Sequence, residues 1–111
     1  MGTKSINTTL KRYVEKINTL LKPEQVILYG SFVRGEARSW SDIDLLIVAD
    51  FKKKKEYELM NMCALIGSRV DDRFLFDVRL INKKEFKRVN KLSIYSEIKK
   101  EGKIIYQNQL K

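Results

Sequence analysis

The stretch from Gly30 to Val48 constrains the fold of this chain more than any other. It reads GSFVRGEARSWSDIDLLIV, with Gly30 and Ser31 at its start and two aspartates, Asp42 and Asp44, separated by one residue. The following residues, 45–48, are apolar and partly β-branched, which predicts a β-strand that carries both aspartates. Side chains two positions apart project from the same face of a strand. We therefore expect the two carboxylates to point in the same direction.

Two carboxylates that point together repel each other unless a positive charge lies between them. Mg²⁺ is the obvious cation, because it prefers carboxylate oxygens together with the oxygens of a substrate phosphate. Gly30 lets the backbone approach a ligand closely, and Ser31 begins a short helical turn whose N–H groups can hold phosphate. The stretch therefore predicts a site for a metal ion and a nucleoside triphosphate.

The spacing G-S-x10-D-x-D resembles the signature of the polymerase-β-type nucleotidyltransferase superfamily. The full stretch is similar to the minimal nucleotidyltransferases, many of which are antitoxins paired with HEPN-domain toxins. A lone D-x-D is weak evidence, but Arg34-Gly35, Ser41-Asp42 and the apolar strand make the match specific. The resemblance covers this motif tightly and the rest of the chain loosely, through length and element order. It implies an α/β (α+β) fold with a small mixed β-sheet flanked by helices.

The resemblance also implies a mechanism of two-metal nucleotidyl transfer from ATP. Asp42 and Asp44 would bind two Mg²⁺ ions, and Asp77 would complete the ion that activates the attacking hydroxyl. Gly30, Ser31 and Arg34 would bind the nucleotide, with the guanidinium of Arg34 on the triphosphate oxygens. Simpler interpretations remain open: a turn or cap for the two aspartates, an ordinary strand-to-helix turn at Gly30-Ser31, and a plain surface position for Arg34.

Asp77 lies in the middle of a predicted strand over residues 74–81. Phe74, Phe76, Val78 and Leu80 alternate with Leu75, Asp77, Arg79 and Ile81. A carboxylate is unusual in such a strand, because aspartate is depleted there. Its alternative role is an ion pair with Arg79 or another neighbour. Asp71 and Asp72 compete for the third-carboxylate role, but they precede the strand and are more typical of a turn.

The rest of the chain alternates predicted helices with predicted strands. In the first part of the chain we expect a helix over 6–21 that ends before Pro23, a short strand over 26–29 and a helix over 56–70. After the strand over 74–81 we expect a short helix through Phe86 and Val89, which begins at an Asn82–Glu85 capping box. A helix over 93–101 that ends at Gly102 and an edge strand over 103–106 follow. We expect a single domain over residues 1–111, with the helices packed on one face of a mixed sheet.

Charge and composition limit the classes of function. Lys and Arg number 23 against 14 Asp and Glu, and the net charge of +9 suits a polyanionic substrate, nucleic acid or an acidic protein surface. Direct nucleic-acid binding is possible but not favoured, because a lysine run such as residues 52–55 is more often a solvated surface. The chain has no histidine and one cysteine, Cys63. This excludes a His/Cys zinc site and every catalytic triad or dyad that needs histidine.

The expected partners follow from the ends of the chain and from the resemblance. No stretch approaches the length of a membrane span and no signal-type apolar core is present, so we expect a cytoplasmic protein without a membrane partner. The chain ends soon after the motif-bearing core, which favours an acceptor on another protein. The resemblance implies an antitoxin that uses ATP to AMPylate and neutralise a HEPN-type helical toxin. The alternatives are transfer to an antibiotic or other small molecule, and a non-catalytic module that neutralises its partner by contact.

Overall fold

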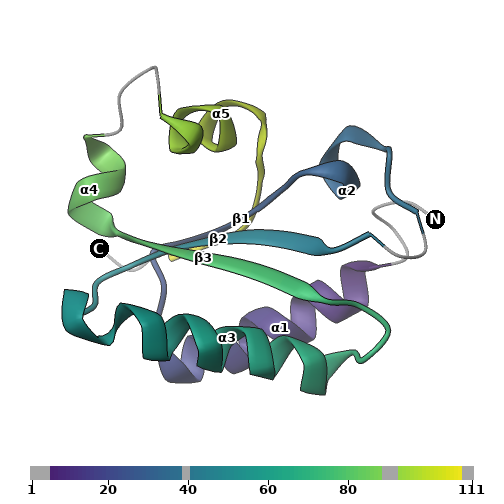
Figure 1. Ribbon diagram of the computed structural model, residues 1–111, viewed down its shortest axis with the longest axis horizontal. Helices are drawn as coiled ribbons and strands as arrows, with labels where there is room; N and C mark the ends of the chain where they lie inside the picture. Colours follow the sequence, from purple (N-terminus) through teal and green to yellow (C-terminus); the bar gives the residue numbers. More distant parts are fainter. Residues whose placement is uncertain (1–5, 39–40, 89–92, 109–111) are drawn as a thin grey trace.

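The computed structural model describes residues 6–38, 41–88 and 93–108. Its elements, in chain order, are α1 (Asn7–Leu20), β1 (Gln25–Tyr29), α2 (Ser31–Arg34), β2 (Ile43–Ala49), the 3-10 turn η2 (Lys53–Lys55), α3 (Glu56–Val70), β3 (Phe76–Asn82), α4 (Lys83–Lys87), α5 (Ile94–Glu101) and β4 (Lys103–Gln107) (Figure 1). The strands form one four-stranded sheet in the order β3-β2-β1-β4. This confirms the predicted small mixed sheet flanked by helices.

The central strands β1 and β2 are antiparallel, whereas β2 and β3 are parallel. A parallel pair needs a crossover connection, and α3 supplies it. The parallel register places Ile43 beside Phe76 and Asp44 beside Asp77. The crossover therefore brings together two carboxylates from distant parts of the sequence.

One face of the sheet packs against α1 and α3, which lie below it in Figure 1. Tyr13 of α1 is fully buried there, stacks on Phe76 with ring centroids 4.9 Å apart, and donates a hydrogen bond to the Cys63 carbonyl over 3.0 Å. Burial raises the pKa of the Cys63 thiol to about 12, so this cysteine is an inert part of the core. The helix predicted over residues 56–70 is confirmed as α3, and it buries Cys63, Gly67 and Val70.

The opposite face of the sheet is covered by α4 and α5, as Figure 1 shows. A second apolar cluster fills the space between them and the sheet; it consists of Ile27, Leu46, Val48, Ile81, Phe86 and Ile98. The prediction that the helices pack on one face is therefore wrong. The physical reason is the continuous apolar run of β2: Leu45 and Ile47 face one side, Leu46 and Val48 face the other, and both sides need a cover.

The predicted capping box at Asn82 is also wrong. Asn82 precedes α4, but its side chain makes no capping hydrogen bond. Its amide instead accepts from the Phe51 N–H over 3.4 Å and donates to the Phe51 carbonyl over 3.2 Å. Asn82 pairs in register with Ala49, so the backbone after β2 is within its reach. Val89, the last residue of the short helix predicted here, lies outside the described residues.

The lysine run at residues 52–55 is exposed, as predicted for a solvated surface. Lys53 lies 3.2 Å from Glu56 and 3.6 Å from Glu85, and Lys55 lies 3.4 Å from Glu58. Part of the positive charge of the run is thus balanced locally. Within the described ranges, no helix is both long enough and apolar enough to cross a membrane.

Candidate active site

Three polar side chains lie in a row across three neighbouring strands. Asp44 on β2 is in register with Asp77 on β3 and with Tyr29 on β1. Directly opposite residues on neighbouring strands have Cβ atoms about 4.5–5.5 Å apart in antiparallel pairs. Alternation along the strands places this row on the sheet face that carries α4 and α5, together with Leu46 and Ile81. The predicted pairing of Asp44 with a carboxylate from a neighbouring strand therefore has its structural basis in the β2–β3 register.

Asp44 is half-buried and surrounded by negative charge. Burial, followed by the charges of Asp77 and Asp42, raises the pKa of Asp44 to about 6, and the charge of Arg34 acts in the opposite direction. Asp77 is exposed, and Asp42 is exposed one residue before β2 begins. The prediction of a strand that begins at Asp42 is therefore off by one residue. The neighbouring carboxylates therefore add to the effect of burial on Asp44, in the direction expected for repulsion between them.

Gly30 joins β1 to α2 directly against Asp44. Its φ is +80° and its ψ is −154°, a backbone conformation that residues other than glycine rarely adopt. A Cβ atom at this position would overlap Oδ2 of Asp44. The Gly30 carbonyl accepts from the N–H groups of Val33 and Arg34 over 3.1 and 3.2 Å, so α2 begins at Ser31. Glycine is therefore required for the turn to approach the carboxylate.

Arg34 ends α2 and is exposed. Its Nε donates to Oε1 of Glu36 over 2.7 Å. Arg34 also lines a hollow of about 160 Å³ between α2 and α5, and the other lining residues are Tyr29, Gly30, Val33, Glu97, Ile98 and Glu101. The structure thus places Arg34 close to Asp44 and Gly30, with its guanidinium engaged by a neighbouring carboxylate.

Sequence reasoning missed the role of Tyr29 and Arg79 at the edge of the site. The Nε of Arg79 donates to the Tyr29 hydroxyl over 3.1 Å. Burial raises the pKa of Tyr29, and Arg79 partly offsets this effect. The alternation of β3 already placed Arg79 on the same face as Asp77, but the position of Tyr29 depends on strand register. Among the described residues, no cationic side chain lies within 4 Å of the Asp77 carboxylate, so the proposed ion pair with Arg79 is not formed.

Asp71 is separated from this site and serves the fold. Its carboxylate accepts from Arg73 over 2.9 and 2.8 Å and from the Thr9 hydroxyl over 2.5 Å. The hydrogen bonds from Arg73 hold the pKa of Asp71 well below its usual range. Asp71 therefore ties α1 to the turn between α3 and β3, in agreement with its interpretation as a turn residue.

The donor set of the site suits a hard divalent cation. Asp42, Asp44 and Asp77 offer carboxylate oxygens, which Mg²⁺ prefers. A cation beside them would relieve the repulsion that raises the pKa of Asp44. In the part of the chain that the structure describes, no three Asp, Glu, His or Cys side chains converge on one point that could hold a metal. Asp44 and Asp77 are neighbours through the strand register, and the carboxylate side chains would have to rotate to share an ion.

The fold and these residues define a class of nucleotide-transferring proteins, and comparison with known families agrees. The family model described as polymerase beta, nucleotidyltransferase matches residues 5–111, so this chain belongs to that family. The superfamily inferred from the G-S-x10-D-x-D spacing is thereby confirmed, and the chain carries a nucleotidyltransferase domain. A comparison with curated protein sequences found no match.

Solved structures share the fold at low sequence identity. A protein from Sulfolobus solfataricus, provisionally assigned as a nucleotidyltransferase, is 23% identical over 95% of this chain and 83% of its own, with a TM-score of 0.62. A chain of a toxin–antitoxin crystallised with AMP-PNP is 20% identical over 93% and 74% of the two chains, with a TM-score of 0.56. A mutant form of the toxin–antitoxin MntA-HpeT is 20% identical over 86% and 71%, with a TM-score of 0.53. At these identities the likeness establishes the fold alone.

Proposed function

We propose that this protein is an ATP- and Mg²⁺-dependent nucleotidyltransferase that transfers AMP to a hydroxyl group of a partner toxin. The observation that carries the proposal is the contact between Gly30 and Asp44, together with the register that pairs Asp44 with Asp77. The family supplies the class of reaction. The choice of ATP is supported by the structural neighbour that was crystallised with AMP-PNP, an analogue of ATP.

The residues of the site have distinct roles in this proposal. Asp42, Asp44 and Asp77 would hold the metal, which when bound stabilises charge on the attacking and leaving oxygens of an in-line displacement. Gly30 and Ser31 bring the backbone to the triphosphate. Arg34 exchanges Glu36 for phosphate oxygens, with which its guanidinium can form paired hydrogen bonds.

The reaction forms a bond between the acceptor oxygen and the α-phosphorus of ATP and breaks the bond from that phosphorus to the pyrophosphate oxygen. Pyrophosphate leaves with the electron pair, and the proton of the acceptor hydroxyl passes to a carboxylate. We assign this proton to Asp77, because it is exposed on the outer strand where an acceptor can approach. Arg79 fixes the Tyr29 hydroxyl beside Asp44 and thereby keeps that side of the site in place.

The proposed acceptor is a protein, and specifically a helical toxin of the HEPN type. Two structural neighbours come from toxin–antitoxin structures, and the Gly30–Val48 stretch resembles antitoxins that pair with HEPN toxins. The outer face of α3 presents Tyr57, Met62 and Leu65, which are 79%, 40% and 51% exposed. Exposed apolar side chains gathered on one helix are typical of protein-binding surfaces.

Asp44→Asn should abolish nucleotidyl transfer and leave the fold intact. The substitution removes a charged ligand from the centre of the carboxylate cluster, and we expect a loss of at least about 100-fold in rate, typical for the loss of a group that stabilises transition-state charge. Transfer of label from α-³²P-ATP to the partner, with Mg²⁺ present, measures this rate. Asp72→Asn makes the same change of charge in the exposed turn before β3 and should retain full activity. Full activity of Asp44→Asn would overturn the assignment.

The same variant distinguishes modification of the toxin from neutralisation by contact. If transfer neutralises the toxin, Asp44→Asn co-expressed with it should fail to protect cells although the two proteins still co-purify. Mass spectrometry of the co-purified toxin should show added AMP with the parent protein and none with the variant. Equal protection by both forms would favour the contact mechanism. An unmodified toxin, together with activity on a small molecule, would favour the small-molecule alternative.

A further inference from the structure

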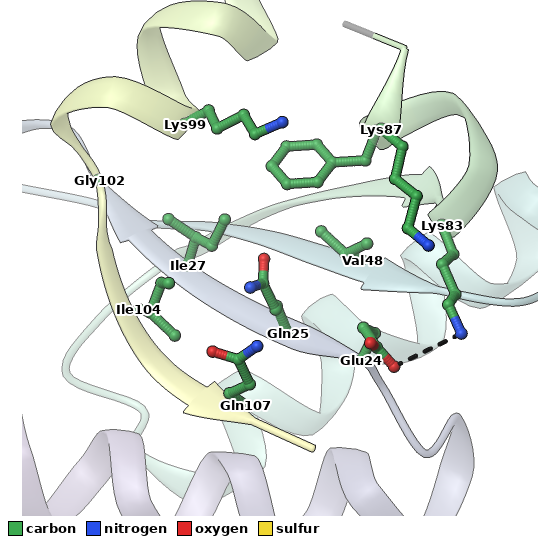
Figure 2. Close-up of a pocket in the computed structure, with 11 residues that line it drawn as sticks. Glu24, Gln25, Ile27, Val48, Lys83, Lys87, Lys99, Gly102, Ile104 and Gln107 are labelled. Atoms are coloured by element: carbon green, nitrogen blue, oxygen red, sulfur yellow. Dashed lines mark ion pairs between the residues drawn. The ribbon is translucent and has the colours of Figure 1, made fainter. Parts of the chain in front are cut away.

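A second hollow lies on the α4/α5 face of the sheet, away from the carboxylates. It has a volume of about 340 Å³, within the range typical of small-molecule pockets. Ile27 and Val48 of the sheet form its floor (Figure 2), and Phe86 of α4 also lines it. All three are at most 6% exposed and belong to the second apolar cluster. We call this hollow, with the lysines described next, the basic pocket.

The basic pocket is separated from the candidate active site by α5. Val48 lies four residues beyond Asp44 on β2, a distance of about 13 Å along a strand. Lys99 and Gly102 line the basic pocket, whereas Glu97 and Glu101 line the hollow beside Gly30. The two hollows thus open on different sides of one helix, and none of the candidate catalytic carboxylates lines the basic pocket.

Three lysines border the basic pocket, Lys83 and Lys87 from α4 and Lys99 from α5 (Figure 2). Lys83 forms an ion pair with Glu24 over 3.7 Å. The Nζ of Lys99 lies 4.9 Å from the centroid of the Phe86 ring, and within the described residues neither Lys87 nor Lys99 has a carboxylate within 4 Å. Two positive charges therefore remain unbalanced at an apolar hollow, which favours an anionic ligand.

Two side-chain amides complete the lining. Gln25 and Gln107 are register partners on β1 and β4, and Figure 2 shows both amide groups at the hollow. Among the described residues, neither amide has a hydrogen-bond partner, so both can donate to and accept from a ligand. Adjacent amides above an apolar floor suit the polar edge of a flat ring.

We propose that the basic pocket binds a small phosphorylated molecule with a flat uncharged body, of the size of a nucleoside monophosphate. The ammonium groups of Lys87 and Lys99 act as point charges for the phosphate. The flat body lies on Ile27 and Val48 with its polar edge toward Gln25 and Gln107. The proposal does not depend on the proposed function, since it uses none of the carboxylates of the candidate active site.

Titration of the full chain with AMP in EDTA tests this proposal, because EDTA removes divalent cations from the carboxylate site. We expect saturable binding by calorimetry, with NMR shifts of the backbone amides around Gln25, Gly102 and Ile104. Lys87→Gln combined with Lys99→Gln should weaken binding at least about tenfold, since both charged contacts are lost. Asp44→Asn should bind as tightly as the parent. Inorganic phosphate and adenosine, titrated separately, should each bind more weakly than AMP, because each makes only part of the contacts.

The matched control is Lys84→Gln combined with Lys100→Gln, which removes the same charge from the same two helices. Lys84 and Lys100 are exposed and do not line the basic pocket, so binding should stay within about twofold of the parent. Equal weakening by both double variants would show a general attraction of the basic surface and overturn the proposal. The absence of saturable binding would overturn it, as would NMR shifts confined to residues 30–34.

Discussion

At the scale of single residues, Gly30 and Asp44 explain each other. Glycine has the positive φ that the turn after β1 needs, and it has no Cβ to strike the Asp44 carboxylate. Any other residue at position 30 would be strained and would also displace the carboxylate. The Asp44 carboxylate on the next strand therefore explains why the first residue of the G-S pair is a glycine.

Asp44→Asn should stabilise the metal-free protein at neutral pH. The folded-state pKa of Asp44, about 6, lies above its usual value of 3.8, so folding favours the protonated form. The stabilisation that the raised pKa of Asp44 gives to the folded protein is fully present below about pH 4, and it is lost as the pH rises through about 6. We expect the variant to gain about 1 kcal/mol at pH 7.5, a reduced figure because water screens a half-exposed carboxylate. At pH 4 we expect little difference.

Thermal unfolding in EDTA at the two pH values measures this difference. Asp72→Asn serves as the control, because its carboxylate is exposed in a turn outside the cluster. Addition of Mg²⁺ at pH 7.5 should raise the melting temperature of the parent more than that of Asp44→Asn. An equal effect of the substitution at both pH values would contradict the raised pKa of Asp44.

At the scale of elements, the close packing of α3 on β3 at Gly67 fixes the distance between this helix and the outer strand of the sheet. Gly67 faces the ring of Phe76, and a Cβ atom on Gly67 would overlap that ring. Phe76 immediately precedes Asp77, and it also stacks on Tyr13 of α1. The close approach of helix and strand at Gly67 therefore helps to position the outer carboxylate.

Gly67→Ala should destabilise the protein by about 1–3 kcal/mol, because the added methyl group overpacks the α3–β3 contact. Helix propensity alone predicts the opposite sign, a gain of up to about 1 kcal/mol. Ser68→Ala changes the next position of the same helix, which is exposed, and should be neutral or slightly stabilising. Urea unfolding of both variants gives the comparison, and a more stable Gly67→Ala would show that the strand can move away without cost.

The elements were predictable where a local pattern determines them. The apolar stripe of α1, the run of β2 and the alternation of β3 each place an element within one or two residues of its observed bounds. The neighbourhood of Tyr29, Asp44 and Asp77 was not readable from local pattern, because it depends on pairing between three strands. The packing of α4 and α5 on the second face of the sheet was not predicted, because the sequence of an apolar strand does not show which helices will pack on it.

At the scale of the whole molecule, Asp71 joins parts of the chain that are far apart in sequence. It accepts from Thr9 of α1 and from Arg73 before β3, and these bonds lower its pKa. A lowered pKa contributes stability above the usual value of 3.8 and loses it as the pH falls through the folded-state value. Asp71→Asn should therefore cost about 1–3 kcal/mol at pH 6, the range for hydrogen bonds to charged groups.

Denaturant unfolding at pH 6 and pH 3 tests this expectation. The destabilisation by Asp71→Asn should shrink at pH 3, because the carboxyl group of the unfolded parent is largely protonated below about pH 3.8 whereas the folded carboxylate stays charged. Asp72→Asn at the neighbouring position should change stability by less than about 0.5 kcal/mol at both pH values. A constant destabilisation by Asp71→Asn would show that the hydrogen bonds act without the charge.

The parallel pairing of β2 with β3 also determines when during folding the carboxylates can meet. The chain must pass through the whole of α3 before Asp77 can lie beside Asp44. Pairing of distant segments is slow compared with the formation of local helices and hairpins. In a chain still emerging from the ribosome, Gly30 and Asp44 are therefore available before Asp77 can pair beside them. The complete set of carboxylates exists only in molecules whose central sheet has already assembled.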